Sequence, residues 1–375
     1  MDLAGAGLGR PHRQQTLRQT IQWSHTLLPP DLQRVFRQLA VFSGDFDLDA
    51  MAAVNDVPAD PLDSVAELVD GSLAAVGTGP DGEPRIRLLR TIAAFARERL
   101  DDDDNDNDND GEADEARRRH ARHYLTLAEA AGPRLRTRQH LSARDWFELE
   151  LDNLRAALAW SLQPNGSDDG IRTDDLTIGL RLCGALSWFW YACGYQSEGR
   201  GWLSAASVRA SGQDSSAVMT ALHGLGVLLR QQGDLDGSRA ALERCLDYWT
   251  RIGNRAQVAA ELSSLAAVHR ARGDNDLART MLADGIAAAR EAGIAPAWPT
   301  ACPTWRCSIS TSAPRRRLRC STRRWTWTGN WATRGGSRAI TPTWLMRCIE
   351  PAASPTPIDT SARTRRRRWP SATSS

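Results

Sequence analysis

Two histidines form a pattern in this sequence that could bind a metal ion. His120 and His123 stand three residues apart, a spacing that places both imidazoles on one face of a helix, where they could hold zinc. A zinc site needs further ligands, but no Cys or acidic residue stands in a suitable place nearby, and two arginines precede the pair. We therefore expect a pair that faces solvent rather than a metal site.

An acidic run offers a second candidate, for calcium. Asp and Asn alternate towards position 110, and with Gly111 they match the first half of a calcium-binding loop. The second half should supply a bidentate Glu, but the chain has Arg117 at that place. We therefore interpret residues 101–115 as a solvated, self-repelling acidic linker.

Nucleotide and covalent chemistry find no support in the sequence. Gly5, Gly7 and Gly9 only partly resemble a dinucleotide loop, because Arg10 stands where a further glycine would be needed. The chain contains no lysine, so a Walker-type phosphate loop and a lysine Schiff base are both excluded. No Ser/His/Asp arrangement or catalytic carboxylate pair stands out either. We expect a protein that is not an enzyme, with no catalytic, cofactor-binding or metal-binding residues.

Composition indicates a cytoplasmic protein with an unusual C-terminal part. The net charge of +2 over 375 residues hides an acidic body and a basic tail, since residues 297–375 hold 15 arginines and two acids. No signal peptide follows Met1, and the apolar stretch 182–193 is too short to cross a bilayer. We expect no membrane association.

The strongest signal is an internal repeat. Residues 217–254 and 257–294 are self-similar at an offset of 40 positions, which indicates helical repeats rather than an irregular bundle. Each copy predicts two antiparallel helices joined by a Gly-Asp turn, and such pairs stack into a solenoid because one pair cannot bury its own apolar face. The signature residues are Leu225, Gly226, Gly233, Asp234, Arg239 and Leu242 in one copy and Leu265, Gly273, Asp274, Arg279 and Leu282 in the next.

This periodicity stops where a third copy should begin. Residues 297–375 hold seven of the 14 tryptophans, a composition unusual for an ordered domain. Back-translation of 315–332 in a shifted frame gives an Ala/Leu/Asp pattern that ends in Gly and is similar to residues 239–254. We expect 297–375 to be a disordered, frame-shifted tail, so its arginines are not taken as a nucleic-acid patch.

Residues 16–100 predict a small winged-helix domain. Three short helices precede two strands, near 72–76 and 85–89, and a closing helix. The third helix, 61–71, contains acids and no arginine, so it would repel DNA phosphates. Possible DNA or partner contacts on the wing are Arg85, Arg87 and Arg90.

Five motifs in order resemble one family. They are Arg13–Ser24, Leu39–Phe46, Leu68–Leu73, Arg87–Ile92 and Glu148–Leu158. They are similar to motifs of actinobacterial signal-transduction ATPase transcriptional regulators (NB-ARC/STAND-type, LuxR/AfsR-like). The resemblance implies a winged helix that packs on an ATPase and tetratricopeptide-type repeats that receive an inducer or partner. We expect no ATPase in the few residues before the first motif, so no nucleotide-binding residue is carried over from the family.

The expected fold is mainly α, with a winged-helix domain at 16–100, a helical, tetratricopeptide-like repeat domain at 116–296, and loops or tails at 1–15 and 297–375. The expected function is that of a non-catalytic regulatory and protein-interaction module, a fragment of such a regulator. A stand-alone winged-helix DNA-binding regulator is the alternative. We expect a protein or peptide partner on the repeats, with nucleic acid possible but not favoured, and no cofactor.

Overall fold

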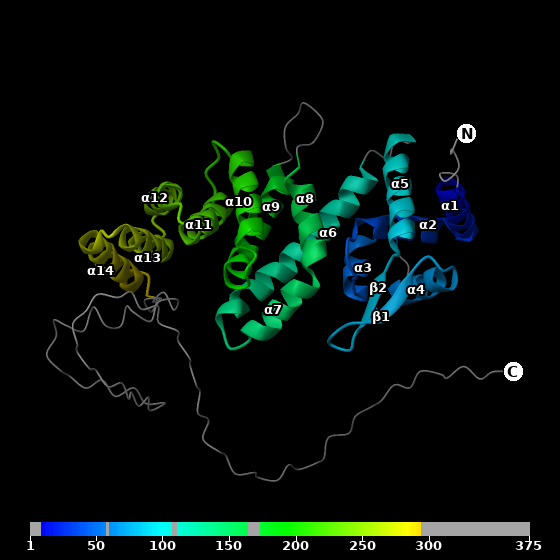
Figure 1. Cartoon of the computed structure of the whole chain (residues 1–375), viewed down its shortest axis with the longest axis horizontal. Helices are drawn as coiled ribbons and strands as arrows, with labels where there is room; N and C mark the ends of the chain where they lie inside the picture. Colours follow the sequence, from blue (N-terminus) through cyan, green and yellow to red (C-terminus); the bar gives the residue numbers. More distant parts are fainter. Residues whose placement is uncertain (1–8, 58–59, 107–110, 164–172, 294–375) are drawn as a thin grey trace, which may run out of the picture. The chain divides into compact units, whose positions relative to one another are not determined.

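The computed structural model describes residues 9–57, 60–106, 111–163 and 173–293, and within them the chain is mainly α-helical, as the sequence predicts (Figure 1). All of these residues belong to one compact unit, residues 1–306. The predictions for 297–375, including the frame shift, fall outside the described residues. Among the described helices, none has the length and apolarity needed to cross a membrane.

The N-terminal part combines short helices with one β-hairpin. Asp47 and Asp60 each cap a short helix, because their carboxylates accept hydrogen bonds from backbone N–H groups of the first turn. In the antiparallel hairpin Val76 lies opposite Ile86, and Phe46 adds a bridge to Ile86 from before the third α-helix. The elements are α1 (Gly9–Leu27), α2 (Pro30–Gln38), the 3-10 helix η1 (Leu39–Val41), α3 (Leu48–Val54), α4 (Pro61–Asp70), β1 (Ala75–Thr78), β2 (Pro84–Arg87) and α5 (Arg90–Asp106).

Helix boundaries differ from two of the expectations. α1 begins at Gly9, so the loop expected through residue 15 is wrong over 9–15, because Pro11 in a first helical turn breaks no hydrogen bond. The expected linker is also shorter than 101–115. α5 continues to Asp106, and Arg117 of the next helix pairs with Asp101 at 2.5 Å, which ties the start of the acidic run to the fold.

A middle group of helices follows, and it packs against the first long helix of the repeats. Phe147 stacks on Phe189 with ring centroids 5.0 Å apart, and both side chains are fully buried. Tyr124, Leu154 and Leu158 belong to the same core. The group consists of α6 (Glu112–Ala131), the 3-10 helix η2 (Gly132–Arg136), α7 (His140–Leu149) and α8 (Leu151–Ser161).

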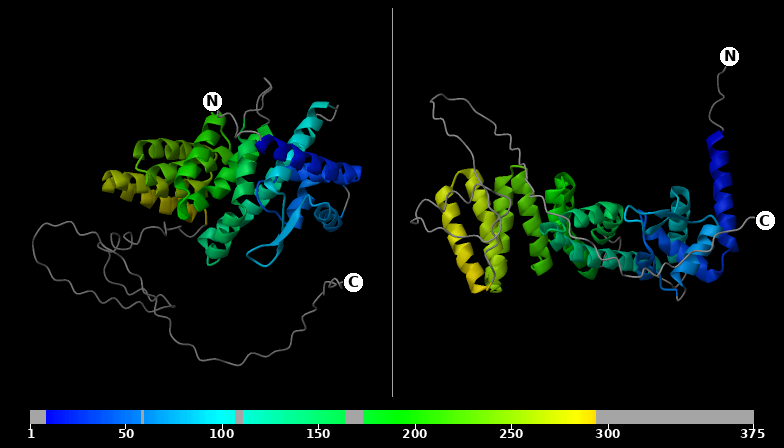
Figure 2. Two further views of the ribbon diagram at one scale, coloured as in Figure 1. Left: turned by 45° about the vertical axis from the view of Figure 1, so that its right-hand side comes forward. Right: turned by 90° about the horizontal axis from the view of Figure 1, so that it is seen from below.

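The predicted antiparallel helix pairs are confirmed. Each helix contacts the next, and the first helices of the pairs also contact one another, α9 with α11 and α11 with α13. α11 to α14 lie side by side in the right-hand view of Figure 2. The pairs are α9 (Thr173–Ala192) with α10 (Gln196–Arg209), α11 (Ser216–Gln231) with α12 (Leu235–Arg251), and α13 (Arg255–Arg272) with α14 (Asn275–Glu291).

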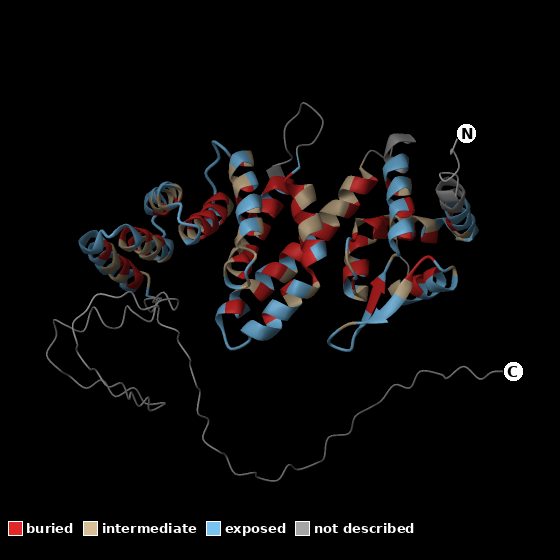
Figure 3. Ribbon diagram, in the orientation of Figure 1, coloured by how far each residue is buried: buried red, intermediate tan, exposed pale blue. Residues whose placement is uncertain are grey.

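Buried residues lie on the facing sides of these helices, with exposed residues on the outer sides (Figure 3). Leu225, Leu242 and Leu265 expose 8%, 1% and 0% of their surface. The core continues into the N-terminal part through Phe36, Phe46 and Met51. This continuity makes the helical repeats and the hairpin part of one packed structure.

Candidate functional site

The Gly-Asp turns have the geometry that a tight helix-to-helix connection needs. Gly233 and Gly273 have φ of 86° and 97°, left-handed values that disfavour residues with a Cβ. Asp234 and Asp274 stand at the N-caps of α12 and α14, and the Asp234 carboxylate accepts a hydrogen bond from Gly237 N. These turns set each second helix antiparallel to its first.

Gly226 allows α11 and α12 to approach closely. A Cβ at this position would stand 2.8 Å from Cγ of Leu242, closer than carbon atoms pack. The corresponding position in the next copy is Ala266, which is fully buried. Leu282, the counterpart of Leu242, is half-buried. The second copy therefore accommodates the methyl group of Ala266 where the first copy has Gly226, because Leu282 is less enclosed than Leu242.

The signature arginines lie at the surface. Arg239 comes within 4.0 Å of Asp236 and Arg279 within 2.7 Å of Asp276, and the arginine side chains expose 43% and 69% of their area. Exposed pairs of this kind contribute little to stability. Their positions in the two copies correspond, and in both copies the arginine pairs with an aspartate three residues earlier.

The first helices of the pairs form one continuous surface, which we call the first-helix face. It is defined by Thr220 and Val227 of α11 and by Ala260 and Ala267 of α13. Thr220 and Ala260 are exposed, whereas Val227 and Ala267 are half-buried. These four side chains are small and uncharged, and the surfaces of stacked helix pairs are the binding surfaces of repeat proteins.

A buried carboxylate joins α11 to α13 beside this face. Glu261 exposes 1% of its surface, and both of its oxygens lie 2.9 Å from Nδ1 of His223. A buried carboxylate without a partner would be costly. The His223–Glu261 contact therefore fixes the spacing of the first helices.

A second buried network joins the hairpin to the middle helices. Arg85 of β2 reaches Glu150, which lies between α7 and α8, with a guanidinium nitrogen 2.6 Å from Oε1. The Tyr124 hydroxyl donates to the other carboxylate oxygen at 3.0 Å. Burial raises the pKa of Glu150, although Arg85 and its other partners oppose that shift. The pKa of Tyr124 is raised by burial and by the nearby Glu150 charge.

Asn153 extends this network to the loop before α3. Its side-chain oxygen accepts from the backbone N–H groups of Ser43 and Gly44 at 3.0 and 3.1 Å, and its amide donates to the carbonyl of Asp45 at 3.0 Å. Arg85 donates to the same Asp45 carbonyl at 2.7 Å. The hairpin, the loop and the start of α8 are thus held by one polar cluster inside the fold.

The three arginines predicted on the wing separate into two kinds. Arg85 exposes 5% of its surface and points into the chain's own interior, so it is not the exposed contact that we expected, because Glu150 and the Asp45 carbonyl hold its donors. Arg87 and Arg90 are exposed. On α4, Asp63 and Glu67 are exposed as well.

The histidine pair is not the solvent-facing pair that we expected. His120 exposes 2% of its surface and packs between Phe42 and Tyr124, with ring centroids 5.1 and 4.8 Å away. Burial lowers the pKa of His120 to about 3, so its ring is neutral. His123 is half-buried. The face of α6 that carries His120 packs against α3, which sequence spacing alone did not reveal.

Aromatic residues at the end of α9 are divided between core and surface. Phe189 and Trp190 are buried, as expected of packing residues. Trp188 and Tyr191 are half-buried, and the Trp188 ring carries the guanidinium of Arg136 at 4.4 Å. Trp188 therefore has a polar neighbour that core packing does not require.

Metal-ligand clusters and reactive thiols are two kinds of site that the described residues could contain. In these parts of the chain no group of three or more His, Cys, Asp and Glu side chains is placed to hold a metal ion. Burial raises the pKa of the Cys183 and Cys245 thiols, which makes both poor nucleophiles. The acidic run falls partly outside the described residues, at 107–110.

Glu150 and Asn153 are the residues that sequence reasoning missed. Both lie in a stretch that the sequence marked only as a resemblance, and both are buried polar residues within an apolar helical pattern. A polar residue in such a pattern is itself a signal, because it needs a partner. The partner, Arg85, stands far away in the sequence and could not be named from it.

Comparisons with known proteins agree with the repeat assignment. Residues 217–291 match the tetratricopeptide repeat family. The chain is 40% identical over 207 residues to a protein of Mycobacterium tuberculosis, and equally to one of Mycobacterium bovis, each named "Putative HTH-type transcriptional regulator". The match covers 54% of this chain and 21% of each relative, so the chain spans about a fifth of the length of these curated relatives.

Two further similarities are more limited. An uncharacterized protein of Mycobacterium tuberculosis is 37% identical over 105 residues, which cover 27% of this chain and 26% of that protein. A solved structure of a signal-transduction ATPase with a tetratricopeptide repeat sensor, from Pyrococcus horikoshii, covers 78% of this chain and 48% of that one. Its TM-score is 0.29 at 10% identity.

Proposed function

We propose that this chain is a non-catalytic regulatory and protein-interaction module of a STAND-type transcriptional regulator, whose repeats receive a protein or peptide partner. The observation that carries the proposal is the stack of antiparallel helix pairs with Gly-Asp turns over α11 to α14, within the tetratricopeptide match. Stacked pairs of this kind present extended surfaces for binding. The names of the mycobacterial relatives support the regulatory part.

The buried cluster around Glu150 supports a role in transmission. The repeats pack on the middle helices. These helices are in turn joined to the hairpin part through Arg85, Tyr124 and Asn153. Because these links are buried hydrogen bonds and an ion pair, they resist independent motion of the two parts. We propose that the N-terminal part is a winged-helix domain that moves with the repeats.

DNA binding by this domain is the alternative, and the charges of α4 argue against it. Asp63, Glu67 and Asp70 are all exposed on α4, where they would lie close to DNA phosphates in the usual docking of a third helix. Phosphate contacts supply most non-specific affinity. Sequence-specific retention of a DNA duplex by the purified chain at physiological salt would favour this alternative.

The proposal is tested by capture with matched variants. The full chain is used to isolate partners from an extract of the organism that encodes it, and a captured protein is purified and titrated. Ala260→Arg with Ala267→Arg places two charges on the first-helix face; Thr280→Arg with Ala287→Arg places two on α14 at the same spacing. We expect the two substitutions on α13 to weaken binding at least about tenfold. The two substitutions on α14 should have little effect, because they lie outside the interface.

Two results would contradict the proposal. Equal affinities of the two variants for the captured protein would show that the first-helix face does not bind it. Turnover of ATP or another substrate by the purified chain would show that the module is an enzyme.

A further inference from the structure

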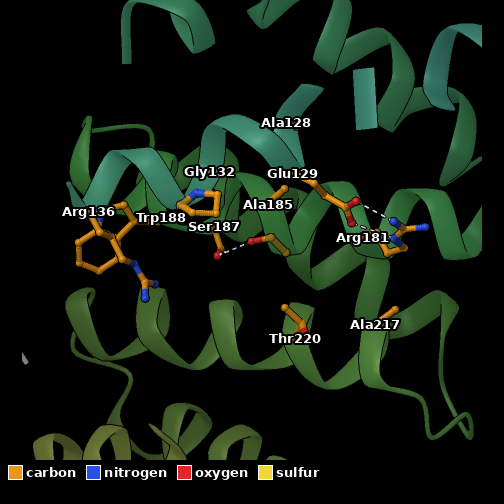
Figure 4. Close-up of a pocket in the computed structure, with 12 residues that line it drawn as sticks. Ala128, Glu129, Gly132, Arg136, Arg181, Ala185, Ser187, Trp188, Ala217 and Thr220 are labelled. Carbon is orange, nitrogen blue, oxygen red and sulfur yellow. Dashed lines mark hydrogen bonds and ion pairs between the residues drawn. The ribbon is translucent and has the colours of Figure 1, made fainter. Parts of the chain in front are cut away.

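A cavity of about 460 Å³ opens between α6, η2, α9 and α11 (Figure 4). α9 supplies its floor, with Arg181 at one end, the small residues Gly184 and Ala185 in the middle and Trp188 at the other end. These positions follow the helical repeat, so they lie on one face of α9. The volume is that of a site for a small organic molecule, and neither the repeat assignment nor the regulatory role requires it.

The cavity is kept open by backbone and small side chains. A Cβ on Gly132 of η2 would stand 3.1 Å from the Ala185 carbonyl oxygen, and one on Gly184 would stand 2.9 Å from the Thr220 methyl. α9 is thus held against η2 and against α11 by close contacts on either side of the floor. Rigid walls of this kind preserve the cavity before a ligand arrives.

The two arginines of the cavity differ in their partners. Arg181 makes a two-point contact with Glu129, at 2.9 Å and 2.6 Å, so the charges of this pair cancel. The guanidinium carbon of Arg136 lies over the Trp188 ring, 4.4 Å from its centroid, and within the described parts of the chain no carboxylate pairs with it. Burial lowers the pKa of Arg136, and no opposite charge offsets the shift. Arg136 is an exposed residue, so the edge of the cavity carries one positive charge that no carboxylate among the described residues pairs with.

Apart from the two arginines, the lining offers a ligand the indole N–H of Trp188 as a side-chain donor, because its two hydroxyl groups already donate within the helices. The Ser187 hydroxyl donates to the Gly184 carbonyl at 2.8 Å, and the Thr220 hydroxyl donates to the Ser216 carbonyl at 2.8 Å. The other lining residues are Ala, Gly and Pro. A molecule that fits must present one anionic group to Arg136 and an apolar body to the rest of the cavity.

We propose that this cavity binds a small organic monoanion, a carboxylate carried on a flat apolar body. The guanidinium of Arg136 is already oriented by Trp188, and its planar fork matches a carboxylate at two points. The apolar body contacts the alanine, glycine and proline residues that line the rest of the cavity. The site goes beyond the proposed partner binding, and its occupancy is measured without any protein partner.

The test titrates the full chain with naphthalene-2-carboxylate and with its neutral amide by isothermal calorimetry. Arg136→Gln removes the cation, and Arg134→Gln removes an exposed arginine of the same 3-10 turn that does not line the cavity. We expect the acid to bind the native chain, the amide to bind at least about tenfold more weakly, and Arg136→Gln to weaken the acid about tenfold, since a charge-assisted hydrogen bond contributes that much. Arg134→Gln should leave the affinity unchanged.

A third variant guards against a folding defect. Arg136→Lys keeps the charge but loses the planar fork and the stack on Trp188, so it should bind the acid with an intermediate affinity. Circular dichroism confirms that each variant keeps its helices. No binding by the native chain at millimolar acid, equal binding of acid and amide, or equal affinities for Arg136→Gln and Arg134→Gln would each overturn the proposal.

Discussion

Replacement of Arg85 by Met should destabilise the hairpin part far more than replacement of an exposed arginine on the same strand. The Arg85 and Glu150 side chains expose 6% and 4% of their area, so the substitution leaves a buried carboxylate without its cation. Breaking a buried ion pair in this way costs about 3–5 kcal/mol. The same substitution at the exposed Arg87, on the same strand, should change the free energy of unfolding by less than about 0.5 kcal/mol.

The double variant separates pairing from packing. Arg85→Met with Glu150→Gln removes both charges while the amide oxygen still accepts from Tyr124, so it should cost clearly less than the sum of the single changes. The loss of stability in the Arg85→Met single variant should be smaller at acidic pH. Burial already raises the pKa of Glu150, so the unpaired carboxylate imposes its penalty above its pKa in the folded protein and loses that penalty as the pH falls below it.

The assay is urea unfolding followed by far-ultraviolet circular dichroism, at neutral pH and again in mild acid. Each transition is compared with those of the native chain and Arg87→Met. Equal costs for Arg85→Met and Arg87→Met, or additive costs in the double variant, would refute the inference that this ion pair joins the hairpin to the helices.

Three other predictions concern contacts within the helical pairs and between them and α8. Gly201→Ala in α10, where a Cβ meets open space, should stabilise the chain by up to about 1 kcal/mol, whereas Gly226→Val should destabilise it by about 1–3 kcal/mol through collision with Leu242; thermal unfolding of both variants checks this contrast. His223→Ala should cost about 1–3 kcal/mol in urea titrations because Glu261 stays buried without its partner, while Ser263→Ala at the corresponding position should be nearly neutral; equal effects would argue against the contact. Arg155 holds the pKa of Glu198 below its usual value, so this contact stabilises the fold above the ordinary carboxyl pKa and is lost as the pH falls through the folded pKa; the stability difference between the native chain and Glu198→Gln should close in acid, and a constant difference would contradict the contact.

The repeats could be predicted because their signals are local. Gly233 and Gly273 recur at a fixed offset, each followed by an Asp that caps the next helix, and both requirements arise within a few residues of chain. The hairpin could be predicted for the same reason, because its signals are also local. Its strands, at 75–78 and 84–87, lie within a few residues of those predicted near 72–76 and 85–89.

The residues that join the parts could not be predicted, because their roles depend on contacts distant in sequence. Arg85 has the same type and neighbourhood as Arg87, and only the fold brings Glu150 to it. His120 lies on an α6 face that packs on α3, a pairing that no local pattern specifies. The cavity at Arg136 and Trp188 likewise needs three segments brought together.

Hydrogen exchange of the full chain with and without its captured protein partner tests the central claim most directly. If the stacked pairs hold that partner, backbone amides should gain protection in α11 and α13, the helices of the first-helix face. Protection confined to α4 and the hairpin, with α11 and α13 unchanged, would contradict the account.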